Sequence, residues 1–187
     1  MKLITITGPV GSGTLLYAKR LSETCLKPSP DVCDVYVGAG LCQKARGACE
    51  CVCCAQLAPF RSPHHTISEA GLIGGARYRT VPANEKRVFP GEVSLASGGV
   101  LLLDQVAEFR LSALQALGRV LKAGKISLAA RDIECEFVAA PTYVVASAYD
   151  CPCGRGSTTD LCSCSKDQIA AHRNKITRAI NALEGRD

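Results

Sequence analysis

The chain has 187 residues, of which 47% are hydrophobic, 5% are aromatic and none is tryptophan. This length suits one domain with an aliphatic core, and no run reaches the roughly 18 apolar residues that a membrane span requires. The net charge of +5 is modest, so it permits contact with nucleic acid but does not by itself indicate it.

The N-terminus and the cysteine content bear on the cellular compartment. The apolar run Leu3–Ile6 is shorter than the hydrophobic core of a signal peptide, and threonine and glycine follow it directly. We therefore expect a soluble, cytoplasmic protein that contacts no membrane. The 12 cysteines would suggest disulfides in a secreted chain, whereas clustered cysteines in a reducing compartment more often bind metal.

The first part of the chain predicts the opening of an α/β nucleotide-binding fold. Lys2–Thr7 is typical of a short buried strand, Gly8–Gly13 is a glycine-rich turn, and Leu15–Thr24 has apolar residues at helical spacing. Two prolines within Lys27–Asp31 end this helix.

The next part of the chain gives weaker signals. Val32–Val37 is a candidate second strand, and Gly38–Pro63 is irregular and rich in cysteine. Glu69–Val88 mixes glycine, arginine and proline, which suggests an exposed insertion. Gly91–Ala96 follows a proline and predicts a short helix.

The second half of the chain has clearer periodicity. Gly99–Asp104 is a continuous apolar run that ends in a carboxylate, as in a parallel strand covered on both faces. Leu111–Leu121 has leucines at helical spacing, and Gly124 is expected to end that helix. The remaining predicted elements are a hairpin of Ile126–Leu128 with Ile133–Val138, a strand at Thr142–Ala146 and a final helix at Gln168–Leu183.

The turn after the first strand has the spacing of a P-loop, G-x-x-x-x-G-K-[ST]. In that motif, backbone N–H groups cradle phosphates, the lysine contacts the β- and γ-phosphates, and the hydroxyl holds Mg²⁺. Thr14 stands at the lysine position here, and Leu15 at the hydroxyl position. Loss of the lysine removes a contact worth about 1.5–3 kcal/mol. The candidate nucleotide-binding residues are Gly8, Pro9, Val10, Gly11, Ser12, Gly13, Thr14 and Leu15.

Two alternatives accompany this interpretation of the loop. The glycines can simply form a tight turn between strand and helix, with no ligand. A shifted alignment would instead make Thr14 the magnesium ligand and delete the lysine. The unshifted alignment is favoured because Ala18 to Leu21 then also match the family named below.

The apolar run before Asp104 has the form of a Walker B strand. Asp104 is expected to hold Mg²⁺, directly or through water. In an active enzyme, a glutamate beside it would activate the attacking water, but this position is Gln105. An amide cannot accept that proton, and loss of a general base typically costs about 10²–10⁴ in rate. The alternative is an ordinary buried strand with a capping aspartate.

Two Cys-x-Cys pairs lie on one loop near the C-terminal helix. Four thiolates from such a loop can surround one tetrahedral Zn²⁺, and a closed site of this kind is structural. The alternatives are free thiols or a disulfide. The candidate metal ligands are Cys151, Cys153, Cys162 and Cys164.

Two other groups of candidate ligands are less specific. The cysteines between Cys42 and Cys54 have a spacing that matches no defined site, so we favour incidental thiols over a second metal. His64 and His65 are adjacent, and on a strand their side chains would point apart. We expect them to be hydrogen-bonded structural residues.

Read in order, these segments resemble the magnesium-chelatase-like AAA+ proteins, above all the ComM/YifB branch. The resemblance runs from residue 1 to about residue 178 and is weakest over Lys27–Leu57. Its most specific motifs are Pro-Phe-Arg-Ser-Pro-His-His-Thr-Ile-Ser at 59–68 and Pro-Gly-Glu-Val-Ser-Leu-Ala at 90–96. The segments Leu72–Gly75, Gly99–Asp104, Glu108–Phe109 and Cys151–Gly154 also match, as does the Cys162/Cys164 pair.

The resemblance implies a P-loop NTPase fold of the AAA+ type, a three-layer α/β/α sandwich with a parallel sheet. We expect one domain over residues 1–187 that lacks the family's C-terminal lid and N-terminal protease-like domain and carries a cysteine-rich loop at 150–165. Family members bind ATP and Mg²⁺ at subunit boundaries of rings. The ComM branch acts on DNA in branch migration, and magnesium chelatases insert metal into a porphyrin. The implied partners are therefore further copies, AAA+ relatives or DNA.

The chain departs from the family pattern at the positions that carry the chemistry. Besides Thr14, Leu15 and Gln105, the position of the family's sensor asparagine is Tyr149, and that of its boundary arginine is Leu183. These departures predict a hydrolysis-deficient pseudo-ATPase that serves as a scaffold or partner-binding subunit, or else a decaying gene fragment. The alternatives are an active ATP-dependent motor on DNA and a zinc-stabilised structural domain with a vestigial nucleotide site.

Overall fold

The computed structural model describes residues 1–25, 58–78, 86–130, 133–156 and 161–186. The strands are β1 (Lys2–Gly8), β2 (Phe60–Arg61), β3 (Gly74–Tyr78), β4 (Lys86–Pro90), β5 (Val100–Leu103), β6 (Lys125–Ala130), β7 (Ile133–Val138) and β8 (Tyr143–Tyr149). The helices are α1 (Thr14–Thr24), α3 (Glu69–Ile73), α4 (Glu92–Leu95), the 3₁₀ helix η2 (Val106–Glu108), α5 (Leu111–Ala123) and α6 (Lys166–Glu184).

A parallel four-stranded sheet in the order β1-β8-β5-β2 forms the centre of the molecule. β8 runs between β1 and β5, with Lys2 opposite Tyr143 and Leu103 opposite Ala146. Because the strands are parallel, β1, β5 and β8 all end at the same edge of the sheet. The residues that follow each strand therefore meet at that edge.

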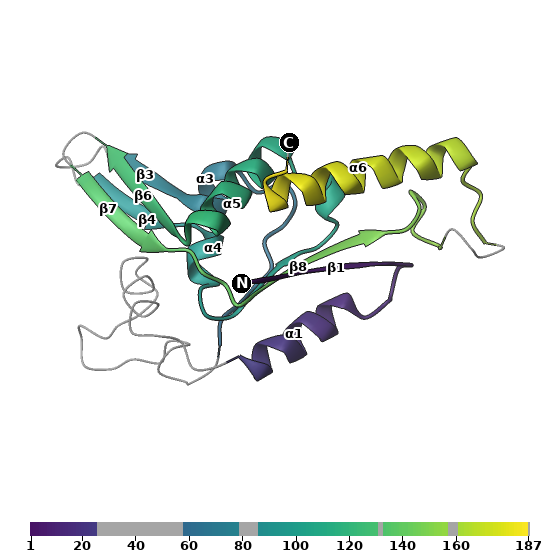
Figure 1. Cartoon of the computed structure of the whole chain (residues 1–187), viewed down its shortest axis with the longest axis horizontal. Coiled ribbons are helices and arrows are strands. Elements are labelled where there is room, and N and C mark those ends of the chain that lie inside the picture. Colours follow the sequence, from purple (N-terminus) through teal and green to yellow (C-terminus); the bar gives the residue numbers. More distant parts are fainter. Residues whose placement is uncertain (26–57, 79–85, 131–132, 157–160, 187) are drawn as a thin grey trace.

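Helices cover both faces of this sheet, as Figure 1 shows, with α1 on one side and α5 and α6 on the other. The α/β fold with a parallel sheet, predicted from the sequence, is thus confirmed. Along β5, Val100 and Leu102 pack with Ala18 of α1. The alternate residues Leu101 and Leu103 belong to the larger core beneath α5 and α6. All four strand residues are buried, which explains the uninterrupted apolar run.

α5 and α6 pack closely against each other through Gly118. A Cβ at this glycine would collide with the carbonyl oxygen of Ala182. α5 ends at Gly124, whose φ of 70° lies in the left-handed region. α6 begins with a capping box, in which Ser165 and Gln168 satisfy each other's backbone N–H groups. Both helix ends are therefore specified locally.

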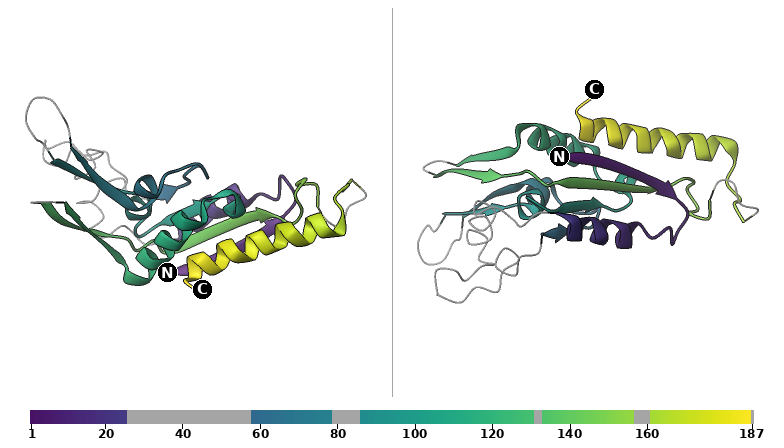
Figure 2. Two further views of the ribbon diagram at one scale, coloured as in Figure 1. Left: turned by 90° about the horizontal axis from the view of Figure 1, so that it is seen from above. Right: turned by 60° about the horizontal axis from the view of Figure 1, so that its bottom comes forward.

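Two antiparallel hairpins, β3–β4 and β6–β7, extend from the end of the sheet opposite to the edge where β1, β5 and β8 finish (Figure 2). The β6–β7 hairpin was predicted. The exposed insertion expected over Glu69–Val88 does extend as a hairpin in its described part, but it is more ordered and less exposed than expected. Ser68 caps α3 by accepting a hydrogen bond from Gly71, and Leu72 is fully buried.

The other predicted elements lie within a few residues of where the sequence places them. The candidate strand Val32–Val37 falls outside the described residues. Among the helices that the structure describes, none combines the length and apolarity needed to cross a membrane.

Candidate functional site

A cavity of about 360 Å³ opens at the edge of the sheet where β1, β5 and β8 end. This volume lies within the range of small-molecule sites. The cavity brings together three segments that the sequence predicts as one composite site: the glycine-rich loop, the end of β5 and the end of β8. Its lining residues are Gly8, Pro9, Gly11, Ser12, Gly13, Thr14, Leu15, Leu16, Asp104, Gln105, Ser147, Ala148 and Tyr149.

The glycine-rich loop has a backbone suited to an anion. Gly11 and Gly13 have φ values of 84° and 76°, in the region that glycine adopts readily. α1 follows without a side-chain cap, so the N–H groups of its first turn have no intrahelical partners. Such a turn and helix N-terminus together form a concave set of donors for phosphate or another anion.

The side chains of this loop do not supply the charge that a phosphate site normally has. Thr14 lies 3.3 Å from Ser12, hydroxyl to hydroxyl, and Leu15 is 51% exposed. Neither lysine nor arginine is among the described residues that line the cavity. On this side, an anion would therefore be held by backbone dipoles and by the hydroxyl groups of Ser12 and Thr14, with no positive charge from the described lining side chains.

Asp104 and Gln105 follow β5 and are held by Ser147, a buried residue of β8. The Ser147 hydroxyl donates to Asp104 Oδ1 and accepts a hydrogen bond of 3.0 Å from the Gln105 N–H. Gln105 has a φ of 55°, the one positive φ among described non-glycine residues. Asp104 and Gln105 both line the cavity.

Ser147 was not singled out from the sequence. It is the hydroxyl residue inside the strand Tyr-Val-Val-Ala-Ser-Ala-Tyr, and a polar residue inside an otherwise apolar strand is a signal that the sequence alone offers. Its partner becomes clear only when β8 is placed beside β5.

Tyr149, at the sensor position, also lines the cavity. Its backbone carbonyl lies 3.0 Å from His172 Nε2 of α6. Because a carbonyl oxygen only accepts, this histidine nitrogen carries the proton. The end of β8 is therefore fixed to α6.

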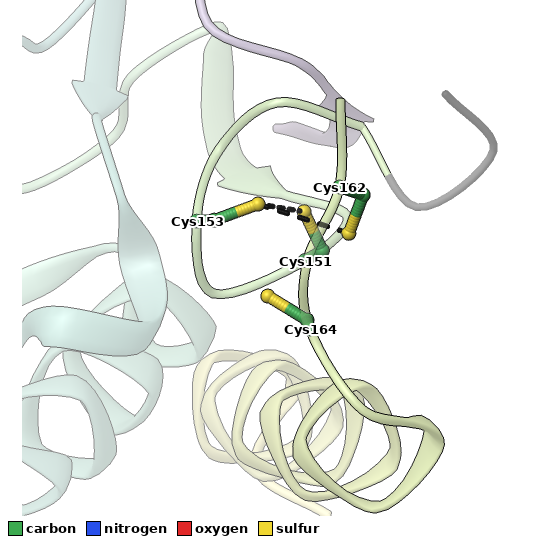
Figure 3. Close-up of side chains that lie close together, drawn as sticks. All are labelled: Cys151, Cys153, Cys162 and Cys164. Atoms are coloured by element: carbon green, nitrogen blue, oxygen red, sulfur yellow. Dashed lines mark hydrogen bonds between the residues drawn. The ribbon is translucent and has the colours of Figure 1, made fainter. Parts of the chain in front are cut away.

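The four cysteines of the predicted metal site converge, as Figure 3 shows, from the turn after β8 and the segment before α6. Their sulfur atoms all lie within 4.8 Å of one another. The Cys151–Cys153 separation is 3.2 Å and the Cys153–Cys162 separation is 3.8 Å. We call Cys151, Cys153, Cys162 and Cys164 the sulfur cluster.

The cluster geometry fits a tetrahedral ion better than a disulfide. Zn–S bonds of about 2.3 Å place tetrahedral sulfurs about 3.8 Å apart, close to the observed separations. A disulfide needs about 2.05 Å, and all four cysteines are free. Cys151 is fully buried, whereas Cys153 is exposed. The residues present therefore suit one thiophilic metal ion.

The thiols of the cluster differ in acidity. The Arg155 backbone N–H, followed by Cys151, lowers the pKa of Cys153 from 9.0 to about 7. The Cys164 backbone N–H lowers the pKa of Cys162, but desolvation and hydrogen bonds to the other sulfurs outweigh it and raise the pKa to about 11. Desolvation is also the first cause that raises the pKa of Cys164.

The histidine pair does not lie on a strand, so the expectation that its rings point apart is wrong. The ring centroids of His64 and His65 are 4.1 Å apart, because a turn closed by the Ile67 N–H on the His64 carbonyl brings them together. His64 Nδ1 lies 2.8 Å from the Thr66 hydroxyl, which agrees with a hydrogen-bonded role.

Two further positions of the family pattern make structural contacts. Arg61 of β2 forms a two-bonded ion pair with Glu92 of α4, with N–O distances of 2.5 and 2.7 Å. This pair joins the two most specific sequence motifs away from the cavity. Leu183, at the position of the boundary arginine, is buried in the core on α6. The cysteines between Cys42 and Cys54 fall outside the described residues.

Comparison with known families places almost the whole chain in one group. Residues 2–182 match the family described as "Magnesium chelatase, subunit ChlI". An uncharacterized protein of Mycobacterium tuberculosis is 35% identical over 179 residues, which cover 93% of this chain and 32% of the relative.

Two further relatives carry the names that the sequence motifs suggest. The competence protein ComM of Haemophilus influenzae is 35% identical over 119 residues, 64% of this chain and 21% of the relative. The uncharacterized protein YifB of Salmonella typhimurium is 34% identical over 133 residues, 67% and 22% respectively. The chain spans about a third or less of the length of these relatives.

Proposed function

Because the chain belongs to the magnesium chelatase family defined by subunit ChlI, we propose that it is an AAA+ nucleotide-binding-type module that does not hydrolyse ATP efficiently and serves as a scaffold or partner-binding subunit. One observation carries this proposal. The cavity brings together the loop, Asp104 and the end of β8, while its described lining residues include no lysine or arginine and have Leu15 at the magnesium-hydroxyl position and Gln105 at the general-base position.

The residues present support weak binding of ATP with Mg²⁺. The loop N–H groups would hold phosphate oxygens, and Asp104, oriented by Ser147, would face the Mg²⁺. When bound, Mg²⁺ would neutralise phosphate charge and polarise the phosphorus centre. The negative charge of Asp104 opposes a free anion, so binding should depend on the metal ion.

The groups that would cleave the phosphate bond are replaced. Gln105 can orient water through its amide but cannot take a proton from it, which costs about 10²–10⁴ in rate. Thr14 provides no positive charge for the transition state. Tyr149 presents a phenol where relatives are expected to present an amide. The surrounding scaffold remains folded and well packed.

The partners we propose follow from the family. The competence protein ComM shares 35% identity with the matched region, and we infer that this chain acts in the cytoplasm with further copies or active AAA+ relatives. DNA is proposed only as a ligand of such an assembly. A pull-down that recovers an active ring subunit would support this role, whereas a strict monomer that ignores such subunits would contradict it.

A titration of ATP with Mg²⁺, followed by melting temperature and by phosphate release, tests the function directly. We expect a small stabilisation at millimolar ATP and no release above background. Ligand at 100 times its Kd would stabilise by about 2.7 kcal/mol, which sets the scale of a tight site. Turnover above background that Asp104→Ala abolishes would contradict the proposal and revive the ATP-dependent motor.

A variant that restores the family residues makes the same test in reverse. The triple change Thr14→Lys, Leu15→Thr and Gln105→Glu should strengthen binding and raise turnover. The single change Gln105→Glu is the matched control, because it restores the base without the phosphate contacts. A triple variant that binds no better than the wild type would show that the loop is not a phosphate site.

The sulfur cluster favours a second candidate function, a zinc-stabilised structural domain whose nucleotide site is vestigial. Four sulfurs within 4.8 Å of one another form a complete ligand set, in contrast to the cavity, and we propose that they bind one structural Zn²⁺. Zinc near one per chain, with no response of the melting temperature to ATP, would favour this second function over the first.

A further inference from the structure

A backbone hydrogen bond joins the glycine-rich loop directly to the sulfur cluster. The N–H of Val10, in the middle of the loop, donates to the carbonyl oxygen of Gly154 at 2.8 Å. Gly154 follows Cys153 in the chain, and its own N–H donates to the Cys151 carbonyl at 3.1 Å. The turn that carries two of the four sulfurs therefore presents its last carbonyl to the loop.

The contact is close as well as hydrogen-bonded. Gly154 is buried, and its φ of 73° is one that glycine favours. A Cβ placed on it would lie 2.8 Å from Cγ2 of Val10. A side chain at this position would therefore press on Val10, and a shift of the turn would change the position of the loop.

The other two sulfurs tie this turn to α6. Cys164 directly precedes Ser165, the N-cap of α6, and His172 of the same helix holds the carbonyl of Tyr149. An ion bound by all four sulfurs would fix the turn between the end of β8 and the start of α6. The position of the Gly154 carbonyl would then depend on that ion.

We propose that a metal ion in the sulfur cluster sets the conformation of the glycine-rich loop through the Gly154–Val10 hydrogen bond, so that metal occupancy controls anion binding in the cavity. This inference rests on the proposed structural zinc. The ion catalyses nothing in this inference. It acts only by holding the backbone of the turn in one conformation. Metal loss would free the turn, lengthen the hydrogen bond and disorder the donors that face the cavity.

Hydrogen exchange of the full chain tests the inference without any activity measurement. Exchange at residues 9–14 should be on the order of tenfold slower in zinc-loaded protein than after chelation, because a lost hydrogen bond lets the loop open. A core peptide from α5 reports global unfolding separately and should stay protected in both states over the same exchange times. Restoring Zn²⁺ should restore protection, whereas Mg²⁺, which prefers oxygen ligands, should not.

A pair of glycine variants tests the link while the metal stays bound. Gly154→Ala should speed exchange at residues 9–14 by a similar factor at unchanged zinc content, because the new methyl group presses on Val10. Gly124→Ala is the matched control, since its φ of 70° gives comparable backbone strain while nothing lies within 4 Å of its Cβ. It should leave the loop unchanged.

The possible outcomes distinguish this inference from the two proposals on which it depends, the structural zinc and the nucleotide-binding function. Zinc bound near one per chain, with loop exchange unaffected by chelation and by Gly154→Ala, would overturn the link and leave structural zinc intact. Absence of bound zinc would overturn both. If chelation also unfolds the α5 region, the two glycine variants, measured in zinc-loaded protein, decide whether the turn and the loop are linked. A loop that responds to zinc yet binds no ATP would contradict the proposed function and the control of anion binding, and would leave only the conformational link intact.

Discussion

The cavity and the sulfur cluster are neighbours joined through Val10 and Gly154. They differ in how many of the ligand groups expected for the proposed nucleotide and metal ion they contain. The cluster has all four sulfur ligands within reach of one ion. The cavity retains its backbone shape and Asp104 but presents Thr14 and Leu15 where a phosphate site needs a cation and a hydroxyl. The cluster thus has a full set of ligands for the proposed metal ion, whereas the described lining of the cavity has neither of these two groups at the family positions.

The difference follows from what each site contributes to folding. A structural metal binds the folded state, so its binding free energy adds to stability. Leu15 is half exposed and Thr14 and Gln105 are partly exposed, and changes at such positions alter stability by about 0.5 kcal/mol or less. We therefore expect substitutions at the phosphate-site positions to leave the fold stable, and loss of a cysteine to lower the stability by removing a ligand of the proposed zinc.

Removal of the metal should have the largest effect. An ion at 1,000 times its Kd stabilises by about 4.1 kcal/mol, equivalent to roughly 8–16 °C in melting temperature for a chain of this size. We expect a chelator to lower the melting temperature by about that amount, as measured by calorimetry. Cys164→Ser should lower it similarly, with free Cys135 changed to Ser as control. Equal melting with and without chelator would make the two sites equally vestigial.

A restored cation in the loop should have the next largest effect. Thr14→Lys should tighten ATP·Mg²⁺ binding by about 1.5–3 kcal/mol, roughly 10- to 150-fold, because it adds the missing charge at the cavity. Thr24→Lys places the same charge at the other end of α1 and should not tighten it. Calorimetric titration measures both affinities. Equal affinities for the two variants would mean that the cavity does not position phosphate beside residue 14.

The support for Asp104 should be worth less. Ser147→Ala leaves the Gln105 N–H and one carboxylate oxygen without their partner, at a cost of about 1–3 kcal/mol in unfolding free energy. The control is Ser127→Ala, since that hydroxyl contacts Glu136 on an exposed hairpin. Urea denaturation compares the two. A Ser147 variant as stable as its control would show that the end of β5 is not held by β8.

The smallest expected effect is on the reactivity of the thiols, and it leaves the fold unchanged. In metal-free protein, the pKa of Cys153 is about 7 and that of Cys162 about 11. Because the thiolate forms as pH rises through the pKa, alkylation of Cys153 should be half-maximal near pH 7, falling about tenfold per pH unit below it. Cys162 should react only at much higher pH. Mass spectrometry of alkylated peptides checks this order, and zinc should suppress both reactions.

Local patterns in the sequence predict the elements that local physics specifies. The run before Asp104 is apolar throughout because β5 is buried on both faces, and α5 ends where Gly124 permits a left-handed turn. The capping box at Ser165 likewise defines the start of α6. Each of these signals lies within a few residues of the structure it determines.

What the sequence did not reveal depends on contacts between distant segments. Gly74 and Gly75 look like loop residues, but pairing with Pro90 and Phe89 places them in a hairpin. Ser147 becomes a partner of Asp104 only because β8 lies beside β5. The Gly154–Val10 hydrogen bond joins two segments that are far apart in the sequence. The roles of the candidate site residues stay predictions until ligands are measured.

α6 links two distant places in the molecule. Near its C-terminal end the backbone rests against Gly118, where the missing side chain of that residue lets two helices touch. Near its other end, His172 forms a hydrogen bond to the carbonyl oxygen of Tyr149 at the cavity wall. Because a helix is rigid along its axis, a change of its packing at Gly118 tilts the whole helix. Gly118→Ala would therefore shift α6 and displace Tyr149, although no residue of the cavity is changed.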